Sequence, residues 1–306
     1  MANSTSTSEV TTRDGEQTSA TREQTTATRE QKMSDRLPDN LLMHVGLIAS
    51  IGLMALPLVL AAIMSTQSVA EIYDVTNLSP GSDAYQNYYR VMTDFNMWTY
   101  LINSTIMAVA IVVGKVALSL RAALALVYYD FPYKNAAFVF VLFTLMLPVP
   151  VRIVPLFELM VTLDWTNSML AITTPYLASA TAVFLFRQHF MAIPSSIVEA
   201  AKLDDVGGLH FLIYVLIPMS KGMIAGISVI TYIYAWNQYL WPLAIISSRD
   251  QQVVQVGLKS LEGTAAAGQI EWGLIMAGAM IALLPPLVVL IVLHKPLLET
   301  FGVQQK

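Results

Sequence analysis

The sequence predicts an all-α, polytopic membrane protein with six transmembrane helices. Of its 306 residues, 55% are hydrophobic and only 12% are charged, whereas a soluble domain has about 25% charged residues. The mean hydropathy of +0.58 agrees with this composition. Apolar runs long enough to cross a hydrocarbon core of about 30 Å recur along the chain. Basic residues gather at one side of these runs, as the positive-inside rule requires.

The chain begins with a polar tail, residues 1–39, rich in Thr, Ser, Glu, Gln and Arg. The tetrapeptide Thr-Arg-Glu-Gln occurs in it at Thr21 and again at Thr28. Such a segment cannot bury enough apolar surface to offset the entropy lost on ordering, so we expect a disordered cytoplasmic extension. Residues 40–306 form the predicted transmembrane domain.

The first two predicted spans are separated by a long polar segment. The first span covers residues 41–64 and follows Lys32 and Arg36, two cations that place its start in the cytoplasm. The polar segment, 65–96, contains several tyrosines typical of a membrane interface, so we expect it outside the cell membrane. The second span covers residues 100–128.

The third and fourth spans follow a cytoplasmic turn at residues 130–135. The third span starts at Ala136 and contains several prolines within residues 147–155. Its helix must therefore be kinked or locally unwound there. After an external turn at 164–168, the fourth span covers residues 171–186.

The last two spans cover residues 223–240 and 272–294, with an external segment at 249–271 between them. Cations near the cytoplasmic span ends outnumber those outside: Lys32, Arg36, Lys134, Arg187, Lys202, Lys221 and Lys295 against Arg90, Arg249 and Lys259. This bias predicts a multi-pass protein of the cell membrane with both termini in the cytoplasm.

One polar segment, residues 194–218, separates the fourth and fifth spans. Burying its charges in hydrocarbon would cost several kcal/mol, so it must project into water. Pro194 breaks the preceding span, and Ser196 is a good N-cap residue. Glu199, three residues later, completes a capping box, so the first half of the segment is predicted to be a short helix.

The rest of this segment predicts a second short helix. Ala200 and Ala201 leave a small-residue surface against which another protein could pack closely. Gly207 and Gly208 are expected to make the turn, and the second helix runs to the helix breaker Pro218.

The order Glu-Ala-Ala, a glycine-containing turn and an apolar helix ending in Ile-Pro resembles the coupling loop of binding-protein-dependent ABC importer permeases. In that family the loop forms two short cytoplasmic helices that dock in a cleft of the ATPase subunit. The resemblance implies a docking role for Ser196, Glu199, Ala200, Ala201, Asp204, Gly207, Gly208 and Pro218. The family usually has glycine after the aspartate that matches Asp204, where this chain has Asp205. The alternative is that Glu199 only caps its own helix.

The resemblance extends over nearly everything after residue 41. Asn103-Ser104 and Phe131-Pro132 are similar to residues of maltose-type sugar-importer permeases. Gly114-Lys115 and Val151-Arg-Ile153 are similar to the second permease subunit of glycerol-3-phosphate importers. The resemblance implies the type I ABC importer permease fold and a glycerol-3-phosphate or glycerophosphodiester solute. A neutral sugar or oligosaccharide is the alternative solute.

The same resemblance implies the partners: a second, homologous permease, two copies of an ATPase and an external substrate-binding protein. ATP and Mg²⁺ would bind to the ATPase, because this chain has no Gly-x-x-x-x-Gly-Lys-Ser/Thr phosphate loop. We expect no enzymatic activity, metal site or nucleic-acid partner, since His-Glu-x-x-His and Gly-x-Ser-x-Gly spacings are absent from the sequence. A passive channel is the alternative class of protein, but in a channel the charged cytoplasmic loop would have no partner to dock with.

Charges inside spans are candidate functional residues. Arg152 lies among prolines, and its forked donors suit a phosphate; alternatively it pairs with Glu158 or with an acid of the partner permease. Lys115 could likewise bind an anionic solute, or it could face a polar seam between subunits. Trp236 and Asn237 could line the solute pathway, although an aromatic belt at the outer interface explains the tryptophan equally well.

Overall fold

The computed structural model describes residues 37–74, 77–146, 148–266 and 268–300. Most of the predicted tail therefore lies outside the described residues, and its last residues, 37–39, already belong to the first helix. The chain divides into two compact units, Met1–Leu60 and Ala61–Lys306.

The first described helix, α2 (Leu37–Met64), has 28 residues. Its apolar stretch Met43–Met64 has 22 residues and a mean hydropathy of 2.5. At about 1.5 Å per residue this stretch is about 33 Å long, which is enough to cross a membrane. The predicted first span is therefore confirmed as a helix of suitable length and composition.

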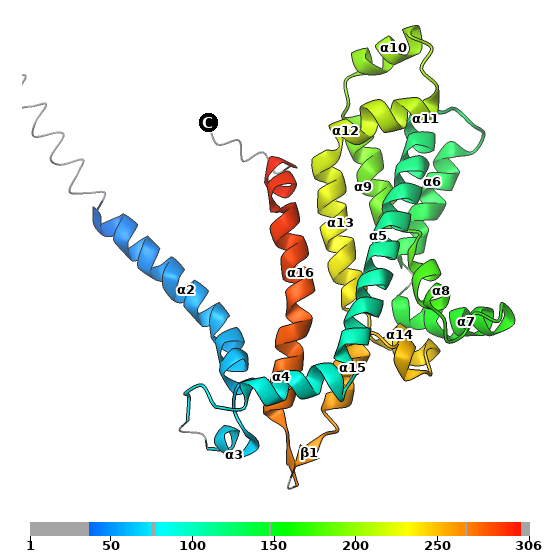
Figure 1. Ribbon diagram of the computed structural model, residues 1–306. Helices are drawn as coiled ribbons and strands as arrows, with labels where there is room; N and C mark the ends of the chain where they lie inside the picture. Colours follow the sequence, from blue (N-terminus) through cyan, green and yellow to red (C-terminus); the bar gives the residue numbers. More distant parts are fainter. Residues whose placement is uncertain (1–36, 75–76, 147, 267, 301–306) are drawn as a thin grey trace, which may run out of the picture. The chain divides into compact units, whose positions relative to one another are not determined.

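Four helices form the centre of the second unit (Figure 1). They are α5 (Met97–Tyr128), α9 (Ala180–Met191), α13 (Lys221–Trp236) and α16 (Trp272–Thr300). Helix α5 packs against both α9 and α13, and α13 packs against α16. Their buried faces are almost entirely aliphatic and aromatic, which is why the helices associate.

Two of the predicted spans are broken helices. Helix α6 (Lys134–Phe143) and η1 (Thr144–Met146) are followed, after a bend of 105°, by α7 (Val149–Thr162). This confirms the break expected from the prolines. The fourth span was predicted as one helix, but it consists of α8 (Met169–Thr173), η2 (Thr174–Tyr176) and α9, with a bend of 41°.

The second break lies at residues 177–179, just after Pro175, where the backbone of Ser179 is extended (φ of −147°) and its side chain accepts a hydrogen bond from the N–H of Ala182. Among the described residues, three helices are long and apolar enough to cross a membrane, or up to six if each bent pair is one span. Six spans were predicted from the sequence, and the count of six, with each bent pair taken as one span, agrees with that prediction.

Short elements gather at the end of the second unit where α5 and α16 begin (Figure 1). They are α3 (Val69–Ile72), α4 (Ala84–Thr93), η4 (Arg249–Gln251), α15 (Val254–Leu261), and a hairpin of β1 (Ala265–Ala266) and β2 (Gln269–Ile270). Helix α14 (Leu240–Ile245) follows α13 and contacts α7 and α8. We call this the α4 end of the unit.

Candidate functional site

The predicted coupling segment lies at the opposite end of the second unit from α4 (Figure 1). Its first helix, α10 (Ser195–Leu203), begins two residues earlier than a Ser196 cap requires, because Pro194 occupies the N-cap position. No side chain at the cap accepts a hydrogen bond from the first turn, so the prediction of a capping box with Glu199 is wrong. Proline fixes the backbone of the entry point instead, with φ of −56°.

The turn after α10 is a Schellman motif. Asp205 lies in the left-handed region with φ of +50°. Its N–H donates to the carbonyl oxygen of Lys202 at 3.2 Å, and the N–H of Val206 donates to that of Ala201 at 3.0 Å. Aspartate thus occupies the left-handed position that glycine usually takes in the related loops.

The turn is therefore centred on Asp205, and the prediction that Gly207 and Gly208 make it is wrong. Gly207 precedes α11 (Gly208–Phe211) with φ of −60°, which any residue adopts, and a Cβ there would meet open space. Gly208 has a steric role, because a Cβ there would overlap the hydroxyl of Tyr129, the residue after α5. Glycine at this position lets α11 approach the end of α5 closely.

The outward surface of α10 combines one acid with small and apolar side chains. Glu199 and Ala200 are exposed, and Leu203 is 87% exposed. Ala201 instead packs against a buried apolar cluster, so only Ala200 supplies the small-residue surface that was expected from both. Glu199 makes no hydrogen bond or ion pair with the residues that the structure describes. Leu203 is an exposed apolar residue of this surface that the sequence analysis did not single out.

The second helical piece consists of α11, the π-helical η3 (Leu212–Leu216) and α12 (Ile217–Met219). Pro218 lacks an N–H, so an ordinary helical turn cannot be completed before it, and the widened turn of η3 relieves this mismatch. The chain then bends by 82° into α13.

This second piece is held firmly by the spans. Phe211 is 5% exposed, and its ring meets that of Tyr128 edge-to-face at 5.4 Å between centroids. The Tyr128 hydroxyl donates to the carbonyl oxygen of Phe190 on α9 at 2.9 Å. Leu212 and Leu216 are buried in the same cluster as Phe211. The coupling segment is thus joined to the ends of α5 and α9 as a packed unit.

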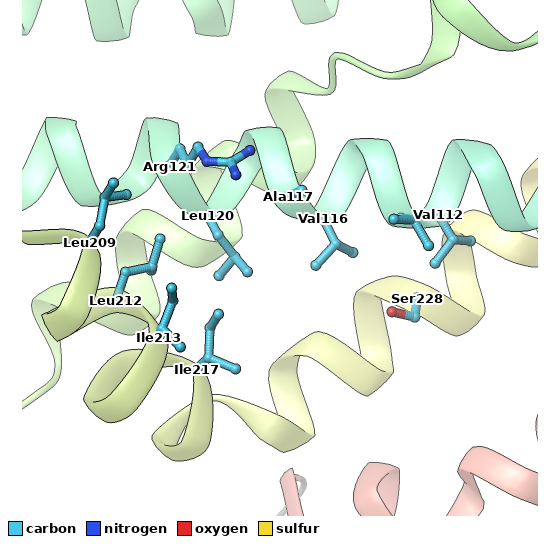
Figure 2. Close-up of a pocket in the computed structure, with 11 residues that line it drawn as sticks. Val112, Val116, Ala117, Leu120, Arg121, Leu209, Leu212, Ile213, Ile217 and Ser228 are labelled. Carbon is cyan, nitrogen blue, oxygen red and sulfur yellow. The ribbon is translucent and has the colours of Figure 1, made fainter.

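An apolar groove of about 340 Å³ lies between α5, the coupling segment and α13 (Figure 2). Its walls are mainly valine, leucine and isoleucine side chains, and Arg121 and Ser228 are its polar members. Such walls suit apolar contacts, so the groove is a poor candidate for holding a polar solute.

Arg152 lies on the first turn of α7, just after the 105° bend, and its side chain is exposed. It makes no ion pair with Glu158 in the part of the chain that the structure describes. The next residue, Ile153, packs against the same buried cluster as Tyr176 of η2. The break thus presents a cation beside the neighbouring span.

Lys115 lies near the middle of α5 and is only 8% exposed. Its Nζ atom is 5.4 Å from the centroid of the Tyr234 ring on α13. The rings of Tyr234 and Tyr176 meet edge-to-face, with 6.2 Å between centroids. Three helical segments therefore bring one ammonium group and two phenol rings together, an arrangement the sequence did not reveal.

The remaining candidates, Trp236 and Asn237, differ in their surroundings. Trp236 is 2% exposed, and its indole N–H donates to the carbonyl oxygen of Ala282 on α16 at 3.1 Å. It packs the core in this structure, neither lining an open pathway nor forming an exposed belt. Asn237 is exposed at the end of α13, where its Oδ1 accepts a hydrogen bond from Gln255.

Comparison with known proteins gives the family. Residues 115–297 match the model of the family described as binding-protein-dependent transport system inner membrane component. The chain is 37% identical over 259 residues to the sn-glycerol-3-phosphate transport system permease protein UgpE of Escherichia coli strain K12, covering 82% of this chain and 92% of that protein. The chain belongs to this family of inner membrane transport components. The resemblance to importer permeases is thereby confirmed.

A second relative of this transport component is the UgpE permease of Yersinia pestis biovar Antiqua, with 37% identity over 265 residues, 84% of this chain and 93% of that protein. Among solved structures, a bacterial ABC transporter involved in the import of the acidic polysaccharide alginate matches with a TM-score of 0.75 and 23% identity, covering 86% of this chain and 97% of that one. The fold of the chain is therefore that of an ABC importer permease.

The α4 end of the permease carries a polar cluster, of which Glu271 alone lies within the family match. Arg90 donates to both carboxylate oxygens of Glu271, at 2.7 and 3.2 Å. The side-chain amide of Asn87 donates to the carbonyl oxygens of Ser65 and Gln67. The hydrogen bond that Arg90 donates to Glu271 raises the pKa of Arg90. The ion pair ties α4 to the start of α16, and the Asn87 bonds tie α4 to residues 65–67; no motif in the sequence indicated either.

Proposed function

We propose that this permease forms part of an ATP-driven importer for sn-glycerol-3-phosphate or a related glycerophosphodiester. The observation that carries the proposal is 37–38% identity over 82–84% of the chain to permeases named for sn-glycerol-3-phosphate transport. Because related permeases share scaffolds while moving different solutes, the solute is the part of the proposal that needs a direct test.

The importer would contain a second, homologous permease, two ATPase subunits and an external substrate-binding protein. The family description, a binding-protein-dependent transport system, supports the last of these. A solved relative of the fold, 11% identical with a TM-score of 0.59, is a bacterial alginate ABC transporter in complex with a periplasmic protein that carries an alginate pentasaccharide. ATP and Mg²⁺ would be bound by the ATPase, since this sequence has no phosphate loop of its own.

In this proposal the coupling segment faces the cytoplasm and receives the ATPase. Helix α10 offers Glu199 for an ion pair, Ala200 for close approach and the exposed Leu203 for an apolar contact. The Schellman turn at Asp205 and the buried anchor Phe211 would make the segment a stiff lever. The excess of cations near this end of the spans supports a cytoplasmic position for both termini.

The test is uptake by vesicles that contain this chain together with its second permease, ATPase and binding protein. Labelled sn-glycerol-3-phosphate should accumulate in an ATP-dependent way, and a neutral oligosaccharide should not. Accumulation of the neutral sugar alone would refute the proposed solute while leaving the chain an importer permease.

A further inference from the structure

We propose that Lys115, Tyr176 and Tyr234 form a subsite for the phosphate of the transported solute, selective for a phosphate monoester. The inference rests on the proposed transport of glycerol-3-phosphate and adds the residues that would meet its charged end. Arg152 supplies a second positive charge, since the next residue, Ile153, packs against the same buried cluster as Tyr176.

The first argument is the isolation of Lys115. Its side chain is largely covered (8% exposed), but its ammonium group, which has three hydrogen-bond donors, is not fully enclosed. Among the residues that the structure describes, it has no hydrogen-bond acceptor and no ion-pair partner; it has only the face of the Tyr234 ring. An ammonium group held between apolar helices is costly without a partner, and an anion that reaches it would pair with it.

The second argument is that the surrounding helices cannot supply this anion. Helices α5, α8, α9 and α13, which the structure describes throughout, contain no Asp or Glu. Glu158 lies on α7, where it is exposed and forms no ion pair within the described residues. The partner of Lys115 must therefore come from outside these helices, and a transported anion satisfies that requirement.

The third argument is the geometry around Lys115. Gly114 lets α5 approach η2 closely, because a Cβ there would lie 2.5 Å from a side-chain carbon of Leu177. The neighbouring Tyr176 is thereby brought to the ring of Tyr234, with the two rings edge-to-face. Phenol hydroxyls donate hydrogen bonds but carry no charge, so they complement a phosphate held by a cation.

The choice of a monoester follows from charge. A phosphate monoester carries about −1.5 to −2 charges at neutral pH, whereas a diester carries a single charge. Lys115 and Arg152 together provide two positive charges, which matches the monoester. The apolar groove near Arg121 offers no comparable set of donors.

The experiment uses the complete importer in vesicles and measures uptake of labelled sn-glycerol-3-phosphate and of a glycerophosphodiester. Because a binding protein would set the capture affinity, the readouts are the uptake rate and the solute moved per ATP hydrolysed. Lys115→Met should lower monoester uptake by about ten- to a hundredfold, the value of a lost charge-assisted bond. Diester uptake should fall less, and Lys115→Arg should restore part of the loss.

The matched control is Arg121→Met, which removes a cation from the same helix, α5, and should leave the uptake of both solutes unchanged. Equal loss of monoester and diester uptake in Lys115→Met, or unchanged uptake, would overturn the subsite. Loss of the second permease from the purified complex would also overturn it, because Lys115 would then be an interface residue.

If Lys115→Met does not yield folded protein, Tyr176→Phe and Tyr234→Phe decide the matter, because each removes only a hydroxyl. Both should lower monoester uptake several-fold, and wild-type uptake in both variants would overturn the proposal. A wild-type importer that moves neither phosphate compound would instead refute the proposed function, so the two failures are distinguishable.

Discussion

Replacing Asp205 with glycine should stabilise the turn between α10 and α11. Asp205 has φ of +50°, in the left-handed region. This conformation costs an L-residue with a side chain about 1–2 kcal/mol and costs glycine little. Glycine also makes the unfolded segment more flexible, which offsets about 0.4–1 kcal/mol of this gain. The net stabilisation of the turn should be about 0.5–1 kcal/mol.

Two matched variants separate the causes. Asp204 has φ of −83°, so Asp204→Gly removes a similar carboxylate but relieves no left-handed strain, and it should destabilise the end of α10. Asp205→Asn removes the charge while keeping a side chain that tolerates the left-handed region. It therefore measures the repulsion between the carboxylate and the negative end of the helix dipole.

The assay is amide hydrogen exchange of α10 in the detergent-solubilised protein. A gain of about 0.5–1 kcal/mol should slow exchange through local opening about two- to fivefold in Asp205→Gly. The amides of Val206 and Asp205 report directly, since they donate the two bonds of the Schellman motif. Faster exchange in Asp205→Gly, or equal changes in the Asp204 and Asp205 variants, would refute a left-handed residue at this turn.

Three further predictions concern docking and the α4 end. Glu199→Lys should reduce co-purification with the ATPase and solute-stimulated ATP hydrolysis, and normal values for both would contradict the docking role. Arg90→Met should lower the free energy of unfolding by about 1–2 kcal/mol, because it leaves the carboxylate of Glu271, which is only 11% exposed, without its partner. The value is at the lower end for a lost charged pair because Arg90 is 33% exposed and solvent screens its charge. The pKa of Arg90 is raised, so its contribution to stability is complete at neutral pH and is lost only at strongly alkaline pH. The unfolding temperature should therefore not change through Arg90 between mildly acidic and mildly alkaline pH. Gly273→Ala should cost about 1–3 kcal/mol because a Cβ would lie 2.5 Å from a backbone carbonyl oxygen, whereas Gly46→Ala, in open space, should not lower the unfolding temperature.

The spans could be predicted because hydropathy depends on sequence windows and needs no tertiary information. The second span, predicted at residues 100–128, is α5 (Met97–Tyr128), and the break predicted in the third span appears as a bend of 105°. The break just after Pro175 was missed. A single proline is compatible with a kinked helix or with the start of an unbroken one. Packing against other helices determines which of the two forms, and the sequence alone does not show it.

The coupling segment was located correctly, but its local geometry was not. Ser196 and Glu199 have the spacing of a capping box, yet the N-cap is Pro194, two residues earlier, and the box is not formed. Asp205 was treated as a departure from glycine, although two hydrogen bonds and the tolerance of aspartate for positive φ allow it to take the turn. Which residue caps α10 and which takes the left-handed position depend on free-energy differences of about 1 kcal/mol, and local sequence patterns do not resolve differences of this size.

The neighbours of Lys115 could not be predicted, because the rotation of α5 relative to α13 determines which side chains meet. Tyr234 is far from Lys115 in the sequence, and only the packed helices bring the ammonium to the phenol ring. The signal that the sequence did carry was a lysine inside a span, which is costly to maintain without a partner.

Helices α5 and α13 connect the coupling segment to Lys115. The final turns of α5 pack against Phe211 and Leu212, and α13 begins directly after α12 at the bend of 82°. Packed helices transmit displacement because their interiors compress little. Lys115 lies on α5 and Tyr234 on α13, so a force on α10 that shifts the two helices unequally must change the distance between ammonium and ring. In the proposed importer, docking at α10 and the proposed phosphate subsite would therefore be linked mechanically through α5 and α13.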